Sequence, residues 1–250
     1  MIKLSRIIAA IMLMMAAMTC CTKPDESMDD SGDDGYVATV VPHNGGNNDS
    51  ITHGFVDLGL PSGLLWATCN IGASCPEDCG DFFAWGETAT KEMYDWKQYK
   101  FAAYDDDQYC LTKYCSNSSY GLNGFVDSLT VLEPLDDAVR ATWGRGWRMP
   151  TADDWRELLQ YTTDTITIQN GVSGRLFASP NGNSLFLPNT GFFLDNTILC
   201  PNLGIYWSST LQTTFQIVAW SYHSDLDECH VCGTYERSRG HCVRAVRSAE

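Results

Sequence analysis

The sequence predicts an α+β domain with two helices and short antiparallel sheets. Helix signals occur at only two places, near residues 134 and 151, whereas short runs of β-branched and aromatic residues fill most of residues 55–246. Gly, Asn and Pro separate these runs, as in chains whose neighbouring strands are joined by tight turns. Two helices within a strand-rich chain favour α+β over the regular strand–helix alternation of a parallel sheet.

The clearest helix signal begins at Thr151. The Thr151 hydroxyl can accept the N–H of Asp154, and the Asp154 carboxylate can accept the N–H of Thr151, which is a capping box. The apolar positions that follow recur at helical spacing and should form one buried stripe: Trp155, Leu158, Leu159 and Thr162. Pro150 keeps Met149 extended, so a strand-like segment should lead into this helix.

A second helix should begin at Pro134, because proline is favoured in the first turn of a helix. It should end before Gly144, a residue type favoured just after a helix. Its buried face is expected to hold Leu135, Ala138, Val139 and Trp143.

The predicted strands lie on both sides of the two helices. They cover residues 55–58, 64–68, 82–86, 174–178, 184–187, 206–209, 215–220 and 242–246. The first two should pair around a turn at Pro61-Ser62-Gly63. Residues 87–130 are aromatic, polar and irregular, and we expect them to form a long surface excursion.

The start of the chain indicates export. Lys3 and Arg6 precede an apolar run, residues 7–18, which has the pattern of a signal peptide and is too short to span a bilayer. The residues around Cys20 resemble a bacterial lipobox, in which cleavage before a cysteine lets that cysteine receive diacylglycerol. Cys21 is an alternative acceptor, and an ordinary signal peptide with free cysteines is the alternative to lipidation.

The segment after Cys20 is polar and acidic and has no hydrophobic periodicity, so it cannot bury enough apolar surface to fold. It resembles the acidic export signal of Bacteroidetes surface lipoproteins, which implies an outer-membrane protein that faces the cell exterior. The predicted organisation is a signal peptide over residues 1–19, a lipidated flexible tether over 20–53 and a folded domain over 54–250.

The charge of the chain excludes one class of partner. The formal net charge is −15 at pH 7. Nucleic acid and anionic lipid head groups should repel so acidic a chain, so no nucleic-acid partner is expected. The expected membrane contact is the lipid anchor alone.

Nine of the eleven cysteines lie outside the anchor region. Export into an oxidising compartment favours disulfides, so the domain is predicted to be stapled by them. Close spacing suggests local bridges within residues 75–79, 110–115 and 229–232, although the connectivity is open. Because the count of nine is odd, at least one of these thiols is free or pairs with the tether.

A zinc site is the alternative for one group of residues. Its ligands would be Cys229, Cys232, His241 and Cys242, because thiolate and imidazole suit zinc. Their spacing is not that of a zinc ribbon, and export favours oxidised thiols. We therefore expect disulfides there, with no metal and no cofactor.

Six sequence blocks together resemble one family. They are residues 55–73, 80–88, 147–151, 181–188, 204–209 and 240–246. They are similar to the Fibrobacter succinogenes major paralogous domain, which is abundant in surface lipoproteins of Bacteroidetes. The resemblance covers roughly residues 54–247 and implies a C-type-lectin-like domain whose ends meet in a terminal strand pair. Related lectin-like domains serve as adhesin or pilus tips, so the resemblance implies a binding module.

An enzyme is the alternative that the same fold offers. Residues 147–155, Trp-Arg-Met-Pro-Thr-Ala-Asp-Asp-Trp, also resemble a block of formylglycine-generating enzymes, where this block is mainly structural. The copper-binding cysteine pair of those oxidases has no match here, and neither do the calcium-binding motifs of lectins. Because function belongs to the site and not to the fold, we expect no enzyme.

The aromatic residues divide into two groups. Those in the family blocks should be core: Trp66, Trp85, Trp147, Trp155 and Trp207. Those in the irregular excursion offer stacking faces to a sugar or a protein: Tyr94, Trp96, Tyr99, Tyr104 and Tyr109. The alternative is a loop that packs its own aromatics.

The sequence thus predicts a cell-surface lipoprotein that displays a lectin-like module for adhesion or for glycan or protein recognition. Asp49-Ser50-Ile51 resembles the site at which exported Bacteroidetes proteins are glycosylated, so Ser50 is a candidate modification site. The alternatives are a metal-dependent oxidase and a structural envelope component that binds nothing.

Overall fold

The computed structural model of the chain describes residues 53–105 and 108–249. These residues all belong to one unit of the chain, Ala38–Glu250. The predicted signal peptide, Cys20 and Ser50 lie outside the described residues, as does the tether up to residue 52. None of the helices in the described part is long and apolar enough to cross a membrane.

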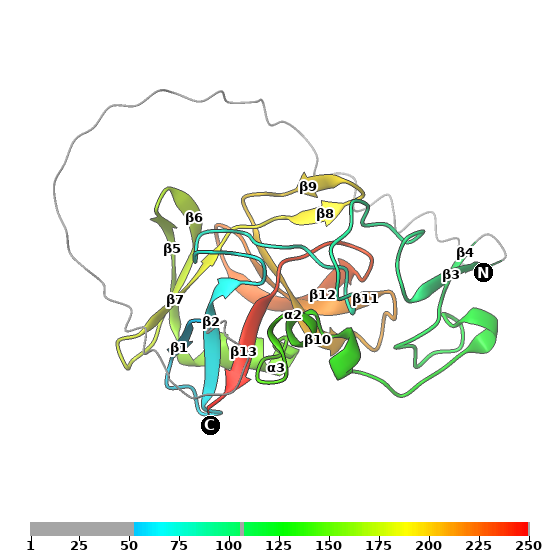
Figure 1. The fold of residues 1–250 in the computed structure, drawn as a ribbon, viewed down its shortest axis with the longest axis horizontal. Coiled ribbons are helices and arrows are strands. Elements are labelled where there is room, and N and C mark those ends of the chain that lie inside the picture. Colours follow the sequence, from blue (N-terminus) through cyan, green and yellow to red (C-terminus); the bar gives the residue numbers. More distant parts are fainter. Residues whose placement is uncertain (1–52, 106–107, 250) are drawn as a thin grey trace. The chain divides into compact units, whose positions relative to one another are not determined.

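The described chain consists of small antiparallel sheets and two short α-helices (Figure 1). The strands are β1 (Phe55–Asp57), β2 (Leu64–Asn70), β3 (Ala102–Asp105), β4 (Gln108–Leu111), β5 (Thr163–Gln169), β6 (Val172–Ala178), β7 (Ser184–Pro188), β8 (Phe192–Leu194), β9 (Thr197–Leu199), β10 (Gly204–Leu211), β11 (Val218–Ser224), β12 (Cys229–Glu236) and β13 (Arg244–Ser248). The helices are α2 (Ala138–Trp143) and α3 (Ala152–Tyr161), with 3₁₀ turns η3 (Leu122–Gly124) and η4 (Pro134–Asp136). This mixed, mainly β composition agrees with the predicted class.

One sheet joins the two ends of the described chain. Its strand order is β1-β2-β13, with both neighbours antiparallel to β2. Trp66 of β2 pairs with Val56 on one side and with Val246 on the other. β13 lies beside β2 in Figure 1, so the last described strand closes a sheet that the first strands begin.

The remaining sheets carry the rest of the domain. Their orders are β5-β6-β7, β10-β11-β12, β8-β9 and β3-β4. Helix α3 lies against the β10-β11-β12 sheet, where the Trp155 ring is 4.8 Å from that of Tyr222 and 4.6 Å from that of Trp66 in β2. Trp155 is therefore a contact point between the helix and two sheets.

The predicted start of α3 is confirmed. Thr151 is the N-cap, its hydroxyl accepts the N–H of Asp154 at 3.1 Å, and the Asp154 carboxylate accepts the N–H of Thr151 at 2.6 Å. Arg148 also pairs with Asp154 at 2.6 Å, which fixes the extended segment before the helix. Of the predicted stripe, Trp155 and Leu158 are fully buried, whereas Leu159 and Thr162 are only half-buried.

The prediction for the second helix is wrong in its first turn. Residues 134–136 form the 3₁₀ turn η4, and the α-helix begins only after Asp137. The Asp137 carboxylate accepts the N–H of Val139 at 2.8 Å and that of Met149 at 3.0 Å, so this residue caps α2 instead of continuing a helix. Leu135, expected on the buried face, is 87% exposed.

Two further strand predictions need correction. Residues 82–86 form only a single bridge, between Phe83 and His241, and not a strand. The excursion over residues 87–130 is not wholly irregular, because it contains the β3-β4 hairpin. The five tryptophans expected in the core are all buried: Trp66, Trp85, Trp147, Trp155 and Trp207.

The predicted disulfides are not present in the structure. All nine cysteines of the described residues are free: Cys69, Cys75, Cys79, Cys110, Cys115, Cys200, Cys229, Cys232 and Cys242. Cys229 and Cys232 pair in regular register with Ser224 and Ser221, so they stand three positions apart on one strand and point to opposite faces. A bridge between these two thiols is therefore excluded by the strand itself.

Candidate binding site

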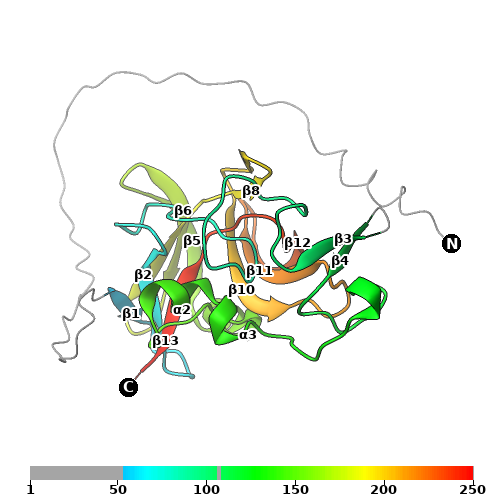
Figure 2. The same ribbon diagram turned by 45° about the vertical axis from the view of Figure 1, so that its right-hand side comes forward.

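The exposed aromatic residues of the excursion lie on the β3-β4 hairpin. Tyr104 of β3 and Tyr109 of β4 are directly opposite each other in the antiparallel register, and their ring centroids are 5.0 Å apart. Tyr104 is 63% exposed and Tyr109 is 40% exposed. Figure 2 shows the hairpin at one side of the domain, away from the β1-β2-β13 sheet, as does Figure 1.

Trp96 links this pair to the body of the domain. Its ring stacks near that of Tyr109, with centroids 6.5 Å apart and planes 26° apart. Its other neighbour is Tyr99, which it meets edge to face at 5.4 Å. Trp96 is half-buried and packs against the core, so the three rings form a supported aromatic surface. We call Trp96, Tyr104 and Tyr109 the aromatic hairpin.

Two of the five predicted contact residues are not on this surface. Tyr94 and Tyr99 are each only 2% exposed, and the Tyr99 hydroxyl donates a 2.8 Å hydrogen bond to the Trp85 carbonyl. The Tyr94 hydroxyl likewise donates to the carbonyl of Phe82. Burial raises the pKa of both phenols above the ordinary value, as expected for tyrosines that serve as core residues.

Arg237, a buried arginine that no sequence motif marks, contacts the excursion. The Arg237 guanidinium donates to the carbonyls of Tyr114 at 2.8 Å and Lys113 at 3.1 Å. It also lies 5.2 Å from the Trp85 ring centroid and 5.4 Å from that of Tyr99. Arg237, directly after β12, thus connects this part of the chain to residues 113 and 114, which follow the hairpin.

Polar groups flank the aromatic hairpin at its tip. Asp105 and Gln108 are cross-strand partners, and Gln108 is exposed. Rigid aromatic faces next to a few polar groups are the usual composition of a site that holds a sugar or another amphipathic ligand. The arrangement can therefore bind by stacking and hydrogen bonding.

The structure does not assemble the alternative zinc site. Across residues 53–105 and 108–249, no group of three or more His, Cys, Asp or Glu side chains is arranged to hold a metal ion. His241 is fully buried and stacks on Trp207 with centroids 3.7 Å apart. Cys242 is also fully buried, and burial raises the pKa of its thiol well above the ordinary value, which disfavours the thiolate that zinc requires.

Comparison of the sequence with known protein families finds no matching family, and comparisons with characterised proteins and with solved structures find no match either. The likeness to the Fibrobacter succinogenes major paralogous domain is a resemblance of sequence blocks alone. The candidate site has to be interpreted from its own geometry.

Proposed function

We propose that the domain is a non-catalytic binding module that recognises carbohydrate through the aromatic hairpin. The observation that supports this proposal is the exposed cross-strand pair of Tyr104 and Tyr109 backed by Trp96. Aromatic rings have few rotatable bonds, so holding them at a surface costs little conformational entropy when a ligand binds. Their faces are apolar, and a tyrosine also carries a polar hydroxyl at the edge of its ring.

The proposal includes the cellular setting that the sequence predicts. The chain would be exported, lipidated at Cys20 and displayed at the outer membrane, with residues 20–53 as its lipidated acidic tether. Ser50 would be a glycosylation site on that tether. The C-type-lectin-like fold implied by the sequence resemblance is part of the same proposal, and the pairing of β2 with β13 agrees with its terminal strand pair.

The anchor can be tested directly. Cys20→Ser should abolish palmitate labelling and release the protein from membranes, whereas Cys21→Ser should leave both unchanged. Labelling that is lost only in Cys21→Ser would move the anchor by one residue. Labelling that persists in both variants would overturn the lipoprotein assignment.

The ligand class can be tested on a glycan array with the soluble body, residues 36–250. Tyr104→Ala and Tyr109→Ala should each weaken binding without changing the unfolding midpoint, because both side chains are exposed. Tyr161→Ala is the matched control, since Tyr161 is 45% exposed at the end of α3, outside the hairpin. Glycan binding that survives in both hairpin variants would remove the hairpin as the site.

The alternatives give different outcomes in the same set of experiments. Binding to immobilised proteins but to no glycan would indicate protein recognition. No ligand on either array would favour a structural envelope component. Stoichiometric copper in the purified protein would favour an oxidase.

A further inference from the structure

One face of the hairpin formed by β11 and β12 carries two histidines and two carboxylates close together. His223 and His230 are directly opposite each other in the antiparallel register. The Asp225 N–H donates to the Glu228 carbonyl at 3.0 Å, so the pairing continues by one more row into the turn. Side chains at every second position share a face, which places both rows opposite to Tyr222, whose ring is packed in the core. Burial and His230 lower the pKa of His223, and the nearby charges of Asp225 and Glu228 partly offset this lowering.

The rings of His223 and His230, which we call the histidine pair, have a separation that matches a shared metal ion. Their centroids are 5.0 Å apart and their planes are 50° apart. A zinc ion binds an imidazole nitrogen at about 2.0–2.1 Å and so lies about 3.2 Å from the ring centroid, which puts two rings at a tetrahedral angle about 5.2 Å apart. The Nδ1 atoms of both rings are buried and have no hydrogen-bond partner within the described part of the chain. A bound ion would give these nitrogens the partner that buried polar atoms usually have.

Glu228 is the side chain best placed to supply a third ligand. Its Oε1 lies 3.8 Å from Nδ1 of His230, and its side chain is 73% exposed. Two ligand atoms on one tetrahedral zinc ion are about 3.3 Å apart, so a small rotation of Glu228 brings its carboxylate to the ion. Asp225 is less suitable, because its Oδ1 already accepts the N–H groups of Asp227 and Glu228. Among the described residues, no three such side chains already surround one point, so the histidine pair is the preformed part of the site.

We infer that the histidine pair binds a zinc ion, with Glu228 as the third protein ligand and water in the fourth position. Two imidazoles and one carboxylate are an established ligand set for zinc, and a site with three protein ligands leaves one position for water. Calcium and magnesium favour oxygen ligands, so the two nitrogen ligands select against them. The site is also distinct from the zinc site considered from the sequence, because it includes none of Cys229, Cys232, His241 and Cys242.

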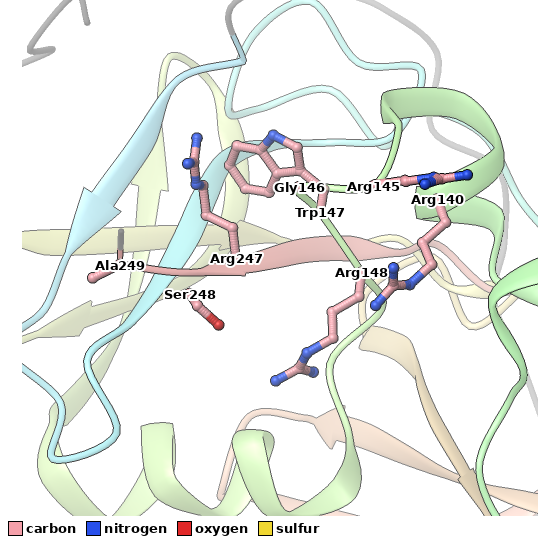
Figure 3. Close-up of a pocket in the computed structure, with 8 residues that line it drawn as sticks. All are labelled: Arg140, Arg145, Gly146, Trp147, Arg148, Arg247, Ser248 and Ala249. Atoms are coloured by element: carbon pink, nitrogen blue, oxygen red, sulfur yellow. The ribbon is translucent and has the colours of Figure 1, made fainter.

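The charge of the protein favours a cation at this hairpin. The formal net charge is −15, and an acidic surface raises the local concentration of cations. The hollow beside β13, about 290 Å³ in volume, has the opposite character, because Arg140, Arg148 and Arg247 are among its lining residues (Figure 3). These arginines would repel a metal ion, and Figure 3 shows Arg148 and Arg247 on opposite sides of β13. No residue of the histidine pair lines that hollow.

The test is calorimetric titration of the purified, metal-free protein with Zn²⁺ at about pH 7.5, where an ordinary histidine is neutral. We expect one zinc ion to bind per chain and an excess of Mg²⁺ not to displace it. His223→Gln and His230→Gln should each lower zinc affinity by about tenfold or more, because each removes one of three protein ligands. Glu228→Gln should lower it less, and this variant leaves the fold intact because the side chain is exposed. Zinc should also raise the urea midpoint of the wild type but not that of the double variant His223→Gln/His230→Gln.

His53→Gln is the matched control, since His53 is a partly exposed histidine that stacks on Trp143, outside the hairpin. It should bind zinc like the wild type, and so should Tyr104→Ala, which tests the proposed glycan site separately. Equal unfolding midpoints of the histidine variants and the wild type without zinc would show that the loss of affinity is local. The inference is overturned if the wild type binds no zinc, if Mg²⁺ displaces it, or if the variants of the histidine pair lose no more affinity than His53→Gln.

Discussion

Trp155 of α3 stacks on Tyr222 of β11, with ring centroids 4.8 Å apart and an angle of 20° between the planes. The Trp155 ring also meets Trp66 of β2, and its Nε1 donates to the carbonyl of Trp207 in β10 at 3.3 Å. One side chain therefore connects the helix to the terminal sheet and to the β10-β11-β12 sheet. The stability of the domain should depend strongly on it.

Trp155→Ala should lower the free energy of unfolding by about 3–5 kcal/mol, because a large buried side chain is lost and a cavity is left. The free energy of unfolding of a domain is only about 5–15 kcal/mol, so this substitution would remove a large part of it. Trp96→Ala should cost much less, since Trp96 is only half-buried. Urea unfolding of both variants measures the difference, and equal losses would contradict this assignment of core and surface.

Arg244 should not be replaceable by lysine. Its fully buried guanidinium donates to Asn70 Oδ1 at 2.8 Å and to three backbone carbonyls, those of Ala67, Thr68 and Phe186. A lysine ammonium cannot reach acceptors in this fork-like arrangement, and it would leave buried carbonyls without donors.

The expected loss for Arg244→Lys is about 2–4 kcal/mol, from the carbonyls left without donors. Urea unfolding would measure it, with Arg156→Lys as the exposed control. A loss no larger than that of the control would show that the β2–β13 contact does not need the guanidinium.

The sequence could predict α3 because its determinants are local. The capping box between Thr151 and Asp154 and the spacing of Trp155 and Leu158 involve residues within one or two turns of each other. The β1-β2 hairpin was predictable for the same reason, since Gly63 allows the positive φ, 70°, at which its turn closes. Such features need no knowledge of the rest of the fold.

Features that depend on distant residues were not predictable. Tyr99 and Tyr104 look alike in sequence, but only the contact with Trp85 and Arg237 makes Tyr99 a core residue. The bridge between Arg148 and Val246 likewise joins residues almost a hundred positions apart. Strand β5 was missed, although most of its residues are β-branched, because it is largely exposed and lacks the continuous apolar face that marks a strand.

Cys229 and Cys232 should not form a disulfide with each other. Their side chains lie on opposite faces of β12, and burial raises the pKa of the Cys229 thiol to about 11. Cys229 should therefore react slowly with alkylating reagents in the native protein and rapidly after unfolding. Peptide mapping without reduction would detect a bridge, and timed alkylation before and after unfolding would measure the reactivity of Cys229. A Cys229–Cys232 bridge would show that β12 is not a regular strand there.

His241 makes the domain sensitive to acid. Burial lowers its pKa well below the ordinary value of 6.5, and Arg239 and His223 lower it further. Among the described residues, neither ring nitrogen of His241 has a hydrogen-bond partner. The unfolded chain therefore binds a proton at His241 more readily than the folded chain does. The stability that the neutral His241 contributes is fully present above about pH 6.5, and it is lost progressively as the pH falls below that value.

His241→Phe should retain the stack on Trp207 and lose no hydrogen bond, because the ring nitrogens have no partner to lose. Its free energy of unfolding should fall less than that of the wild type between about pH 7.5 and about pH 5.5. Some decrease should remain, since burial also lowers the pKa of His223. Urea unfolding at both pH values measures the effect. His230→Gln is the comparison variant: its side chain is 42% exposed, and its removal should change only the lowering that His230 exerts on the pKa of His223. An unchanged pH dependence in His241→Phe would mean that His241 has the same pKa in the folded and the unfolded chain, and so that its ring is not buried.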